Sequence, residues 1–452
     1  MLWLTLCMVM VTLLQTIDAA PVRVHRSADF DESEDWDNFD LEGDFEGPSY
    51  DDPSQYMKPK NQKDDEKDNE DVWKLNLNIT KNVKDDSFFE SDIRLDLLQK
   101  LHVKTNQIYD GIDGRSSRKK RAARTDELYL WKHNTVYYKI DKGFTRDTRI
   151  EIKRGIKHWK KNLKGCLKFI RIDRLTPKEQ AEIRHKHFKG GPIEHILFTK
   201  TDTGCWSQVG RTDTHLNGDT SRKYVPGQQL ISIGDGCGEK GTVIHEIGHA
   251  VGFWHEQSRR DRDEYVKIVR NNILPGQQQQ FIRITNEQVD SMGYAYDYWS
   301  IMHYGSHFFS KNERQTIKVV KKYRSLSPNM QAQLGQREAL SYLDIAQVRA
   351  MYKCNKLPST ESKETCALRS SKGRDYRGTL DYTESGVMCQ PWNRNYPHKH
   401  DYDLNNKEDD LKYNYCRNPQ GDRERPWCYT TLADKDNNPR WEYCDIQLCN
   451  DS

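Results

Sequence analysis

The chain has 452 residues, enough for two or three domains that each bury a core. Its net charge is only +3, but residues 1–121 hold 17 basic and 26 acidic residues, net −9, whereas residues 122–452 hold 54 and 42, net +12. A basic part of this kind favours acidic matrix or acidic substrates. Because the sequence shows no basic helix or stripe, we expect no nucleic-acid partner.

The chain begins with a short apolar run, and the small residues Ala19 and Ala20 follow it. The run is too short to span a bilayer and is typical of a secretory signal, so we predict a signal peptide at residues 1–20. We therefore expect a secreted, extracellular product without a membrane span. Ten of the eleven cysteines follow this segment, and an even number in a secreted chain predicts disulfides.

Residues 21–121 are predicted to form a propeptide. Residues 29–71 are acidic and poor in aliphatic side chains, a composition that does not fold by itself. The stretch "FFESDIRLDLLQKLHV", residues 88–103, has apolar residues at helical spacing and predicts one helix. Asn78 begins a glycosylation sequon.

A basic run, "RKKR", ends at Arg121, where the acidic part of the chain gives way to the basic part. This run fits the cleavage site of a proprotein convertase, which would make Ala122 the mature N-terminus. The alternative interpretation is a basic, solvated loop.

Residues 122–354 mix strand and helix patterns, which predicts an α+β domain. "RDTRIEIKRGIKHWKKNL", residues 146–163, carries Ile150, Ile152, Ile156 and Trp159 at helical intervals. The expected strands are "TVYYKI" (135–140), "HILFTK" (195–200) and "QQLISIG" (228–234). A polar linker at 355–365 leads to a cysteine-dense module at 366–449.

The stretch "HEIGHAVGFWHE" predicts a metal site. His245 and His249 are four residues apart, so on a helix both imidazoles reach one ion. Glu246 follows His245 and can take a proton from a metal-bound water. Ten residues of unbroken helix would carry His255 about 15 Å from His245. Gly252 lies where a break is needed, because glycine tolerates the positive φ that ends a helix.

The alternative is a helix with surface histidines, which the combined spacing of all three histidines and the glycine disfavours. The pattern HExxHxxGxxH with a later methionine turn is the metzincin signature, and "SIMHYG" supplies Met302. With "AARTDELYLW", "GCWSQVG", "YDYWSIMHYG" and "SYLDIAQVRAMYKC", the segment 122–354 resembles the astacin family of zinc metalloendopeptidases.

This resemblance implies a two-lobed α+β metzincin domain with one Zn²⁺ in a central cleft. His245, His249 and His255 would bind zinc, and Glu246 would act as general base and acid. Tyr304 would be an additional ligand that swings away to stabilise the oxyanion.

The resemblance also implies how the enzyme is kept silent and then activated. Glu256 would pair with the new N-terminus at Ala122. A propeptide aspartate in a Phe-x-Gly-Asp context would silence zinc, and "LEGD" makes Asp44 the candidate, with Asp110 and Asp113 as alternatives. Two further implications are disulfides Cys166–Cys354 and Cys205–Cys237, and a role for Arg337 in favouring acidic residues after the scissile bond.

The module at 366–449 resembles a kringle, through "YRGT", "CQPW", "NYCRNP", "PWCYTT" and "WEYC". From spacing alone its six cysteines allow fifteen pairings. The resemblance implies Cys366–Cys449, Cys389–Cys428 and Cys416–Cys444.

Some kringles bind lysine, and the candidate ligand residues here are Asp422, Trp427 and Trp441. Gln420 replaces the other aspartate of such sites, so we expect an extracellular protein or matrix ligand instead of lysine. Three nearby arginines also oppose a bound cation: Arg423, Arg425 and Arg440.

The sequence therefore predicts a secreted zinc endopeptidase, made as a zymogen, that hydrolyses extracellular proteins through a zinc-bound water and Glu246, with a kringle for targeting. The alternative is a catalytically inactive protease scaffold that acts as a kringle-mediated binding protein. A purely structural zinc site is disfavoured because such sites are usually closed by four protein ligands.

Overall fold

The computed structural model describes a large part of the chain, and all of the described residues belong to one compact unit. The described ranges are 88–94, 123–124, 129–200, 204–212, 225–284, 289–324, 330–354, 366–435, 437–446 and 448–449. Within these ranges, none of the helices has the length and apolar character needed to cross a membrane.

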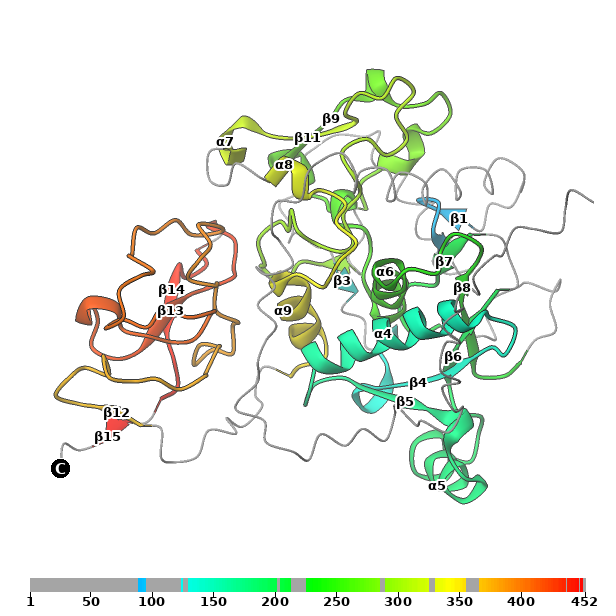
Figure 1. Cartoon of the computed structure of the whole chain (residues 1–452), viewed down its shortest axis with the longest axis horizontal. Coiled ribbons are helices and arrows are strands. Elements are labelled where there is room, and N and C mark those ends of the chain that lie inside the picture. The colour runs from blue at the N-terminus through cyan, green and yellow to red at the C-terminus, as the bar shows by residue number, and fades with distance from the viewer. Residues whose placement is uncertain are drawn as a thin grey trace, which may run out of the picture. The chain divides into compact units, whose positions relative to one another are not determined.

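A seven-stranded sheet forms one side of the part of the chain before residue 355 (Figure 1), in the order β1-β2-β7-β8-β6-β4-β5. Strands β5, β4, β6 and β8 are parallel, and β7 is antiparallel to β8. The three strands expected from the sequence are β4, β6 and β8. The bounds are β1 Phe88–Phe89, β2 Ile93–Arg94, β4 Thr135–Ile140, β5 Lys168–Arg171, β6 His195–Thr199, β7 Cys205–Ser207 and β8 Gln228–Ile233.

The predicted helix at 146–163 is α4, Arg146–Asn162. Thr145 caps its N-terminus, because the Thr145 side chain accepts from the N–H of Thr148. It packs against α6, because Trp159 Nε1 donates to the carbonyl of Ile244 at 3.1 Å. Ile150 is 36% exposed and so lies outside the buried face to which the sequence assigned it. The other α-helices of the described residues are α5 Pro177–Phe188, α6 Lys240–Val251, α7 Lys321–Arg324, α8 Met330–Gln333 and α9 Tyr342–Met351.

The prediction of one helix over 88–103 is wrong for residues 88–94, which form the short antiparallel pair β1–β2. Glu90 and Ser91 turn the chain with φ of 51° and 68°, values that no right-handed helix contains. Ile93 then pairs in parallel with Ser207 of β7. Pairing with a distant strand therefore overrides the local helical spacing.

The remaining strands form two-stranded pairs, and short 3₁₀ turns connect the elements. The strands are β3 Ala123–Arg124, β9 Val266–Ile268, β10 Val289–Asp290, β11 Ile317–Val319, β12 Ala367–Leu368, β13 Trp427–Tyr429, β14 Trp441–Tyr443 and β15 Leu448–Cys449. The 3₁₀ turns are η2 Lys132–Asn134, η3 Ile172–Arg174, η5 Glu256–Ser258, η6 Arg262–Glu264, η7 Arg270–Asn272, η8 Gln278–Phe281 and η9 Pro419–Gly421.

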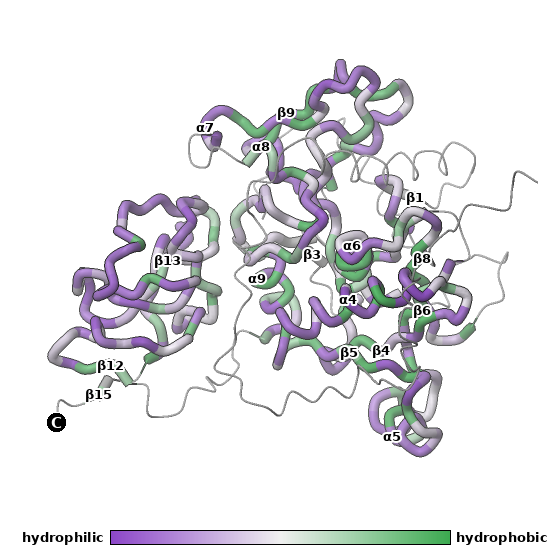
Figure 2. The backbone as a smooth tube through the Cα atoms, viewed as in Figure 1, coloured by the Kyte–Doolittle hydropathy of each residue, from purple (hydrophilic) through white to green (hydrophobic). Residues whose placement is uncertain are grey.

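One large apolar core joins the sheet, α4, α6 and α9, and the module at 366–449 has its own core around Trp392 and Trp427. Figure 2 shows apolar stretches in the part of the chain before residue 355 and a mostly hydrophilic chain in the module at 366–449. The mixed α+β class with a disulfide-rich module is thus confirmed. The disulfides are Cys166–Cys354, Cys205–Cys237, Cys366–Cys449, Cys389–Cys428 and Cys416–Cys444, the same five pairs that the resemblances imply.

Candidate metal centre

Helix α6 ends where the sequence requires a break. Its last residue is Val251, and Gly252 follows with φ 124° and donates its N–H to the carbonyls of Gly248 and His249. His255 then has an extended backbone, with φ −66° and ψ 140°. The turn at Gly252 brings His255 back to the two helical histidines, and the ring centroids of His249 and His255 are 4.7 Å apart.

We expect Gly252→Ala to destabilise the protein by about 1–3 kcal/mol, because a side chain is strained at this φ. Zinc affinity should fall with it, because His255 depends on the turn. Thermal unfolding and zinc stoichiometry measure both effects. Gly143→Ala is the matched control, since Gly143 is exposed, has no positive φ and has room for a methyl group; equal losses in the two variants would contradict the argument.

Two of the histidines offer lone pairs to the same point. His245 Nδ1 contacts the carbonyl of Ile301 at 2.8 Å, and His249 Nδ1 contacts that of Phe253 at 2.9 Å. A carbonyl only accepts, so each Nδ1 carries the proton and each Nε2 is a bare acceptor. Burial lowers the pKa of His245 to about 4 and lowers that of His249 well below its usual value. The rings are therefore neutral, as zinc requires.

The neutral rings face each other with 3.1 Å between the two Nε2 atoms, and the carboxylate of Asp92 lies beside them. Asp92 Oδ2 is 3.2 Å from Nε2 of both His245 and His255. Two facing lone pairs repel unless a cation lies between them. Tetrahedral zinc places its ligand atoms about 3.3 Å apart, and the four ligand atoms here lie within 4.8 Å of one another. The donor set therefore fits zinc.

A second carboxylate, that of Glu90, supports His255 from the other side. Glu90 Oε2 accepts from His255 Nδ1 at 2.6 Å, and Glu90 Oε1 accepts from Ser258 Oγ. Burial acts against the charged ring, but the charges and hydrogen bonds of Asp92 and Glu90 prevail and raise the pKa of His255 to about 9. Carboxylate support of this kind orients a metal-binding histidine.

Glu246 is 1% exposed, and within the described part of the chain its Oε2 has no hydrogen-bond partner. Burial, and secondarily the charge of Asp92, raise its pKa well above the usual value, while the charge of Arg337 acts the other way. An unpaired buried carboxylate is costly and is characteristic of a reacting group.

Tyr304 and Met302 come from the turn below α6. The Tyr304 hydroxyl donates to the carbonyl of Glu90 at 2.7 Å, and its ring lies 4.7 Å from that of His255. Met302 packs directly against α6, since a Cβ added at Gly248 would meet its Sδ at 2.5 Å. The structure thus brings both predicted residues to the histidines.

Arg337 lies under the same turn and is partly buried. Its Nη1 donates to the carbonyls of Ile301 and His303, at 2.8 and 3.2 Å. These bonds support the backbone that carries Met302.

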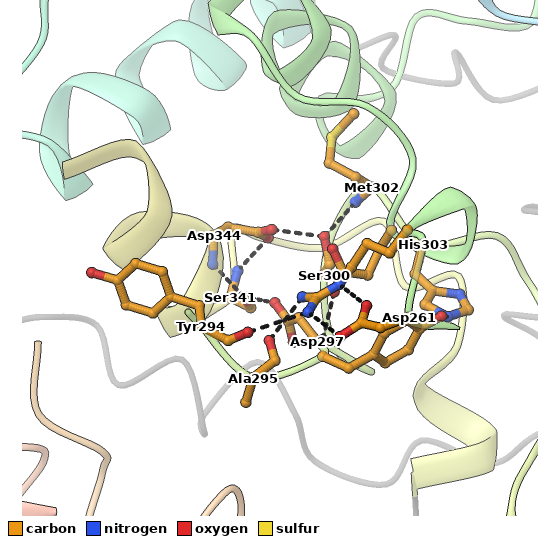
Figure 3. A network of polar contacts seen from close by, with 12 residues as sticks. Asp261, Tyr294, Ala295, Asp297, Ser300, Met302, His303, Ser341 and Asp344 are labelled. Atoms are coloured by element: carbon orange, nitrogen blue, oxygen red, sulfur yellow. Dashed lines mark hydrogen bonds and ion pairs between the residues drawn. The ribbon is translucent and has the colours of Figure 1, made fainter. Parts of the chain in front are cut away.

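Glu256 belongs to a buried polar network, and Figure 3 shows the part of it around Asp261 and Asp297. Its Oε1 accepts from Arg259 Nη1 at 2.9 Å and from the backbone N–H of Asp297 at 2.7 Å. Burial, opposed by the charge of Arg259, raises the pKa of Glu256 to about 7. In this structure Arg259 is the cation that pairs with Glu256. The sequence analysis expected the new N-terminus at Ala122 to be that cation.

In the kringle, the predicted aromatic trough holds an arginine of the same chain. The guanidinium of Arg423 lies 3.4 Å from the ring centroid of Trp441 and 4.4 Å from that of Trp427. Asp422 Oδ2 accepts from the Tyr402 hydroxyl at 2.5 Å. A cation therefore already covers the trough.

Several predicted residues lie outside the described residues: Asn78, Arg121, Ala122, and the aspartates Asp44, Asp110 and Asp113. The aspartate that the structure places with the histidines is Asp92, which the sequence analysis missed. The available signal was "FESD", residues 89–92, which differs from Phe-x-Gly-Asp only by Ser91 in place of glycine. Ser91 keeps the positive φ that glycine favours.

Comparison with known families agrees with this geometry. Residues 123–353 match the family model described as Astacin, a peptidase family, and residues 366–449 match the model of the kringle domain.

Protein SpAN of Strongylocentrotus purpuratus is 34% identical over 278 residues, which cover 62% of this chain and 40% of that protein. Tolloid-like protein 1 of Homo sapiens is 35% identical over 235 residues, covering 52% of this chain and 20% of that protein. The chain thus spans less than half the length of these relatives. A solved structure of high choriolytic enzyme 1, a hatching enzyme zinc-protease from Oryzias latipes, aligns over 51% of this chain and 96% of that one, with 30% identity and a TM-score of 0.39.

Proposed function

The chain belongs to the astacin family of peptidases and carries a kringle; on that premise we propose that it is a zinc endopeptidase, secreted as a zymogen, that hydrolyses peptide bonds of extracellular proteins. The five disulfides support an oxidising, extracellular location. The observation that carries the proposal is the convergence of His245, His249, His255 and Asp92 beside an unpaired Glu246.

In the active enzyme the three histidines would hold zinc. A bound zinc ion supplies Lewis acidity, which polarises a peptide carbonyl and lowers the pKa of water toward neutrality. Glu246 takes the proton from the attacking water and passes it to the leaving amine. Its buried, unpaired carboxylate supports this role, because burial raises its pKa and so strengthens it as the base that accepts the proton of the water.

Tyr304 donates a hydrogen bond to the oxyanion that forms at the substrate carbonyl. Its hydroxyl already donates to a peptide carbonyl, that of Glu90, at 2.7 Å. Once the propeptide leaves, the same donor is available to the substrate. A donor aimed at developing negative charge contributes about 10²- to 10³-fold in comparable sites.

The propeptide keeps the zymogen silent by occupying the site. Asp92 fills the position among the three histidines that substrate and water need, and β2 lies along the edge strand β7. Peptides commonly bind enzymes by adding a strand to such an edge. A proprotein convertase would cut after Arg121, and the new N-terminus at Ala122 would then compete with Arg259 for Glu256.

The kringle would contact an extracellular protein or matrix component through the surface that remains exposed. Arg423 covers the trough formed by Trp427 and Trp441, which argues against a lysine ligand.

Convertase treatment is expected to turn an inert secreted protein into a chelator-sensitive peptidase. The zymogen would be offered a quenched-fluorescence peptide library before and after cleavage at Arg121. Activity should appear only after cleavage, disappear when a chelator removes zinc, and return when zinc is added. A folded, zinc-loaded, processed protein that cleaves nothing would instead support the inactive binding scaffold.

A further inference from the structure

The kringle pairs with the peptidase domain through backbone hydrogen bonds. The N–H of Ala433 donates to the carbonyl of Gly293 at 2.9 Å, and the N–H of Ala295 donates to the carbonyl of Thr431 at 3.2 Å. Between them, Tyr294 and Leu432 form an antiparallel bridge. A short stretch of the kringle thus lies along residues 293–295 of the peptidase domain as a paired strand does.

Tyr396 of the kringle is buried in the peptidase domain's own core. It is 3% exposed and belongs to the same apolar cluster as the sheet and α6. Its hydroxyl donates to the carbonyl of Tyr296 at 2.8 Å, and its carbonyl accepts from the Tyr342 hydroxyl at 2.9 Å. Its ring lies 5.5 Å from the ring of Tyr298.

A chain of charges runs from the kringle to Glu256. Lys435 Nζ pairs with Asp261 Oδ2 at 3.1 Å and with Glu264 Oε2 at 3.2 Å. Asp261 in turn accepts from Nε and Nη2 of Arg259, at 3.0 and 3.1 Å. The other terminal nitrogen of Arg259 binds Glu256. Three successive ion pairs therefore connect a kringle lysine to Glu256, the glutamate next to His255.

The strand pairing and the contacts of Tyr396 with Tyr296 and Tyr298 lie on one segment, residues 289–302. It begins with β10, which pairs with β3 just beyond the processing site, and continues through the residues that contact the kringle. The carbonyls of Tyr294 and Ala295 accept from Arg259, at 3.2 and 3.1 Å. The backbone N–H of Asp297 donates to Glu256, and Met302 packs against α6. Figure 3 shows Asp297 and Met302 on this segment.

We propose that the kringle is a permanently docked part of the peptidase unit, and that Lys435 and Tyr396 are positioning residues that fix the segment 289–302 around Glu256. The docking claim stands by itself, whereas its catalytic consequence rests on the proposed peptidase function. The face of the kringle around Tyr396 and Lys435 is then buried within the chain and does not bind an outside ligand.

Cutting the linker tests the docking without any assay of activity. A specific protease site would be placed in 355–365 of the full chain and cut under non-reducing conditions. No disulfide described in the structure joins the two sides of this linker. The kringle should still co-elute with the peptidase domain in gel filtration at micromolar concentration. Elution of the kringle as a separate species would overturn the proposal.

Paired variants locate the contact. Tyr396→Ala should release the cut kringle, whereas Tyr413→Ala, at an exposed kringle tyrosine, should not. Since Tyr396→Ala could also unfold the kringle, Tyr396→Phe is the milder variant, because it removes only the hydroxyl and should weaken co-elution without unfolding the disulfide-bonded module. Release by Tyr413→Ala to the same extent would contradict the assigned surface.

The positioning role is tested by steady-state kinetics on the uncut, activated chain. Lys435→Met should lower kcat at least about fivefold, the lower end of usual coupling between sites, with little change in KM. Lys435→Arg should restore kcat, because it keeps the charge. Lys372→Met is the matched control, since Lys372 is a kringle lysine paired with Glu424 at 2.9 Å. Unchanged kcat in Lys435→Met would overturn the positioning role. A wholly inactive wild-type enzyme would refute the proposed function. The co-elution result would still decide whether the kringle is docked.

Discussion

Glu246→Gln in the activated enzyme is expected to lower kcat/KM by about 10²- to 10⁴-fold, the usual contribution of a general acid–base group. Glutamine has nearly the same shape but cannot accept the proton of the attacking water. The side chain is buried and its Oε2 has no hydrogen-bond partner among the described residues, so replacing this oxygen by an amide group breaks no hydrogen bond. Zinc content and thermal stability should stay close to those of the wild type, because the three histidines are untouched.

The matched control is Glu239→Gln, at an exposed glutamate just before α6 whose side chain makes no capping hydrogen bond. It should leave kcat/KM unchanged. A Glu246→Gln enzyme that retained more than about a tenth of wild-type activity would show that another group transfers the proton. A variant that lost its zinc would show instead that Glu246 contributes to the metal site.

The histidine site was predictable because its residues lie close together in the sequence. The spacing of His245 and His249 follows from the helical repeat, and Gly252 marks the break that lets His255 return. The same holds for β4, β6, β8 and α4, whose patterns each fall within one element. Ile150 shows the limit of such patterns, because an apolar residue at the edge of a helical stripe can remain on the exposed side.

The contact of Asp92 with the histidines was not predictable from periodicity. Asp92 lies 153 residues before His245, and its place depends on the pairing of β2 with β7 and on the turn at Glu90 and Ser91. The apolar spacing after Phe88 instead favoured a helix. A search that accepted serine for glycine in the Phe-x-Gly-Asp pattern would have found Asp92, since only the backbone conformation is required there.

The docking of the kringle was also not predictable from the sequence, because its contacts join residues that are far apart along the chain. Tyr396 and Tyr342 are 54 residues apart, and Lys435 and Asp261 are 174 apart. Kringle and peptidase motifs were each recognised from short stretches, which carry no information on how two modules meet. Arg259 was likewise missed as the partner of Glu256, because the resemblance assigned that glutamate to a new N-terminus.

Asp92→Ala is expected to make the uncleaved zymogen active. The test uses a chain that a convertase cannot cut, Arg121→Ala, in which the Asp92 carboxylate lies among the three histidines. Truncating one partner of a buried, hydrogen-bonded charge pair costs about 2 kcal/mol or more, which corresponds to at least about a thirtyfold larger open population. Peptidase activity of the uncleaved protein should rise by a similar factor, measured with a quenched-fluorescence peptide.

Asp44→Ala in the same background is the control that separates the two candidate aspartates. If Asp44 silences zinc, Asp44→Ala will release activity and Asp92→Ala will not. Asp110→Ala and Asp113→Ala extend the comparison to the other candidates. One pair of results would refute the role of Asp92. The uncleaved Asp92→Ala protein would stay inactive, and the same variant with Arg121 intact would become active after convertase cleavage.

Glu90→Gln should release much less activity than Asp92→Ala. Glu90 contacts His255 at Nδ1, the nitrogen that faces away from the other ligands, and an amide oxygen can still accept from that N–H. The carbonyl of Glu90 also keeps its bond to the Tyr304 hydroxyl, because the substitution leaves the backbone unchanged. The order of activities, with Asp92→Ala far above Glu90→Gln, therefore distinguishes a carboxylate that occupies the ligand position from one that only supports a ligand.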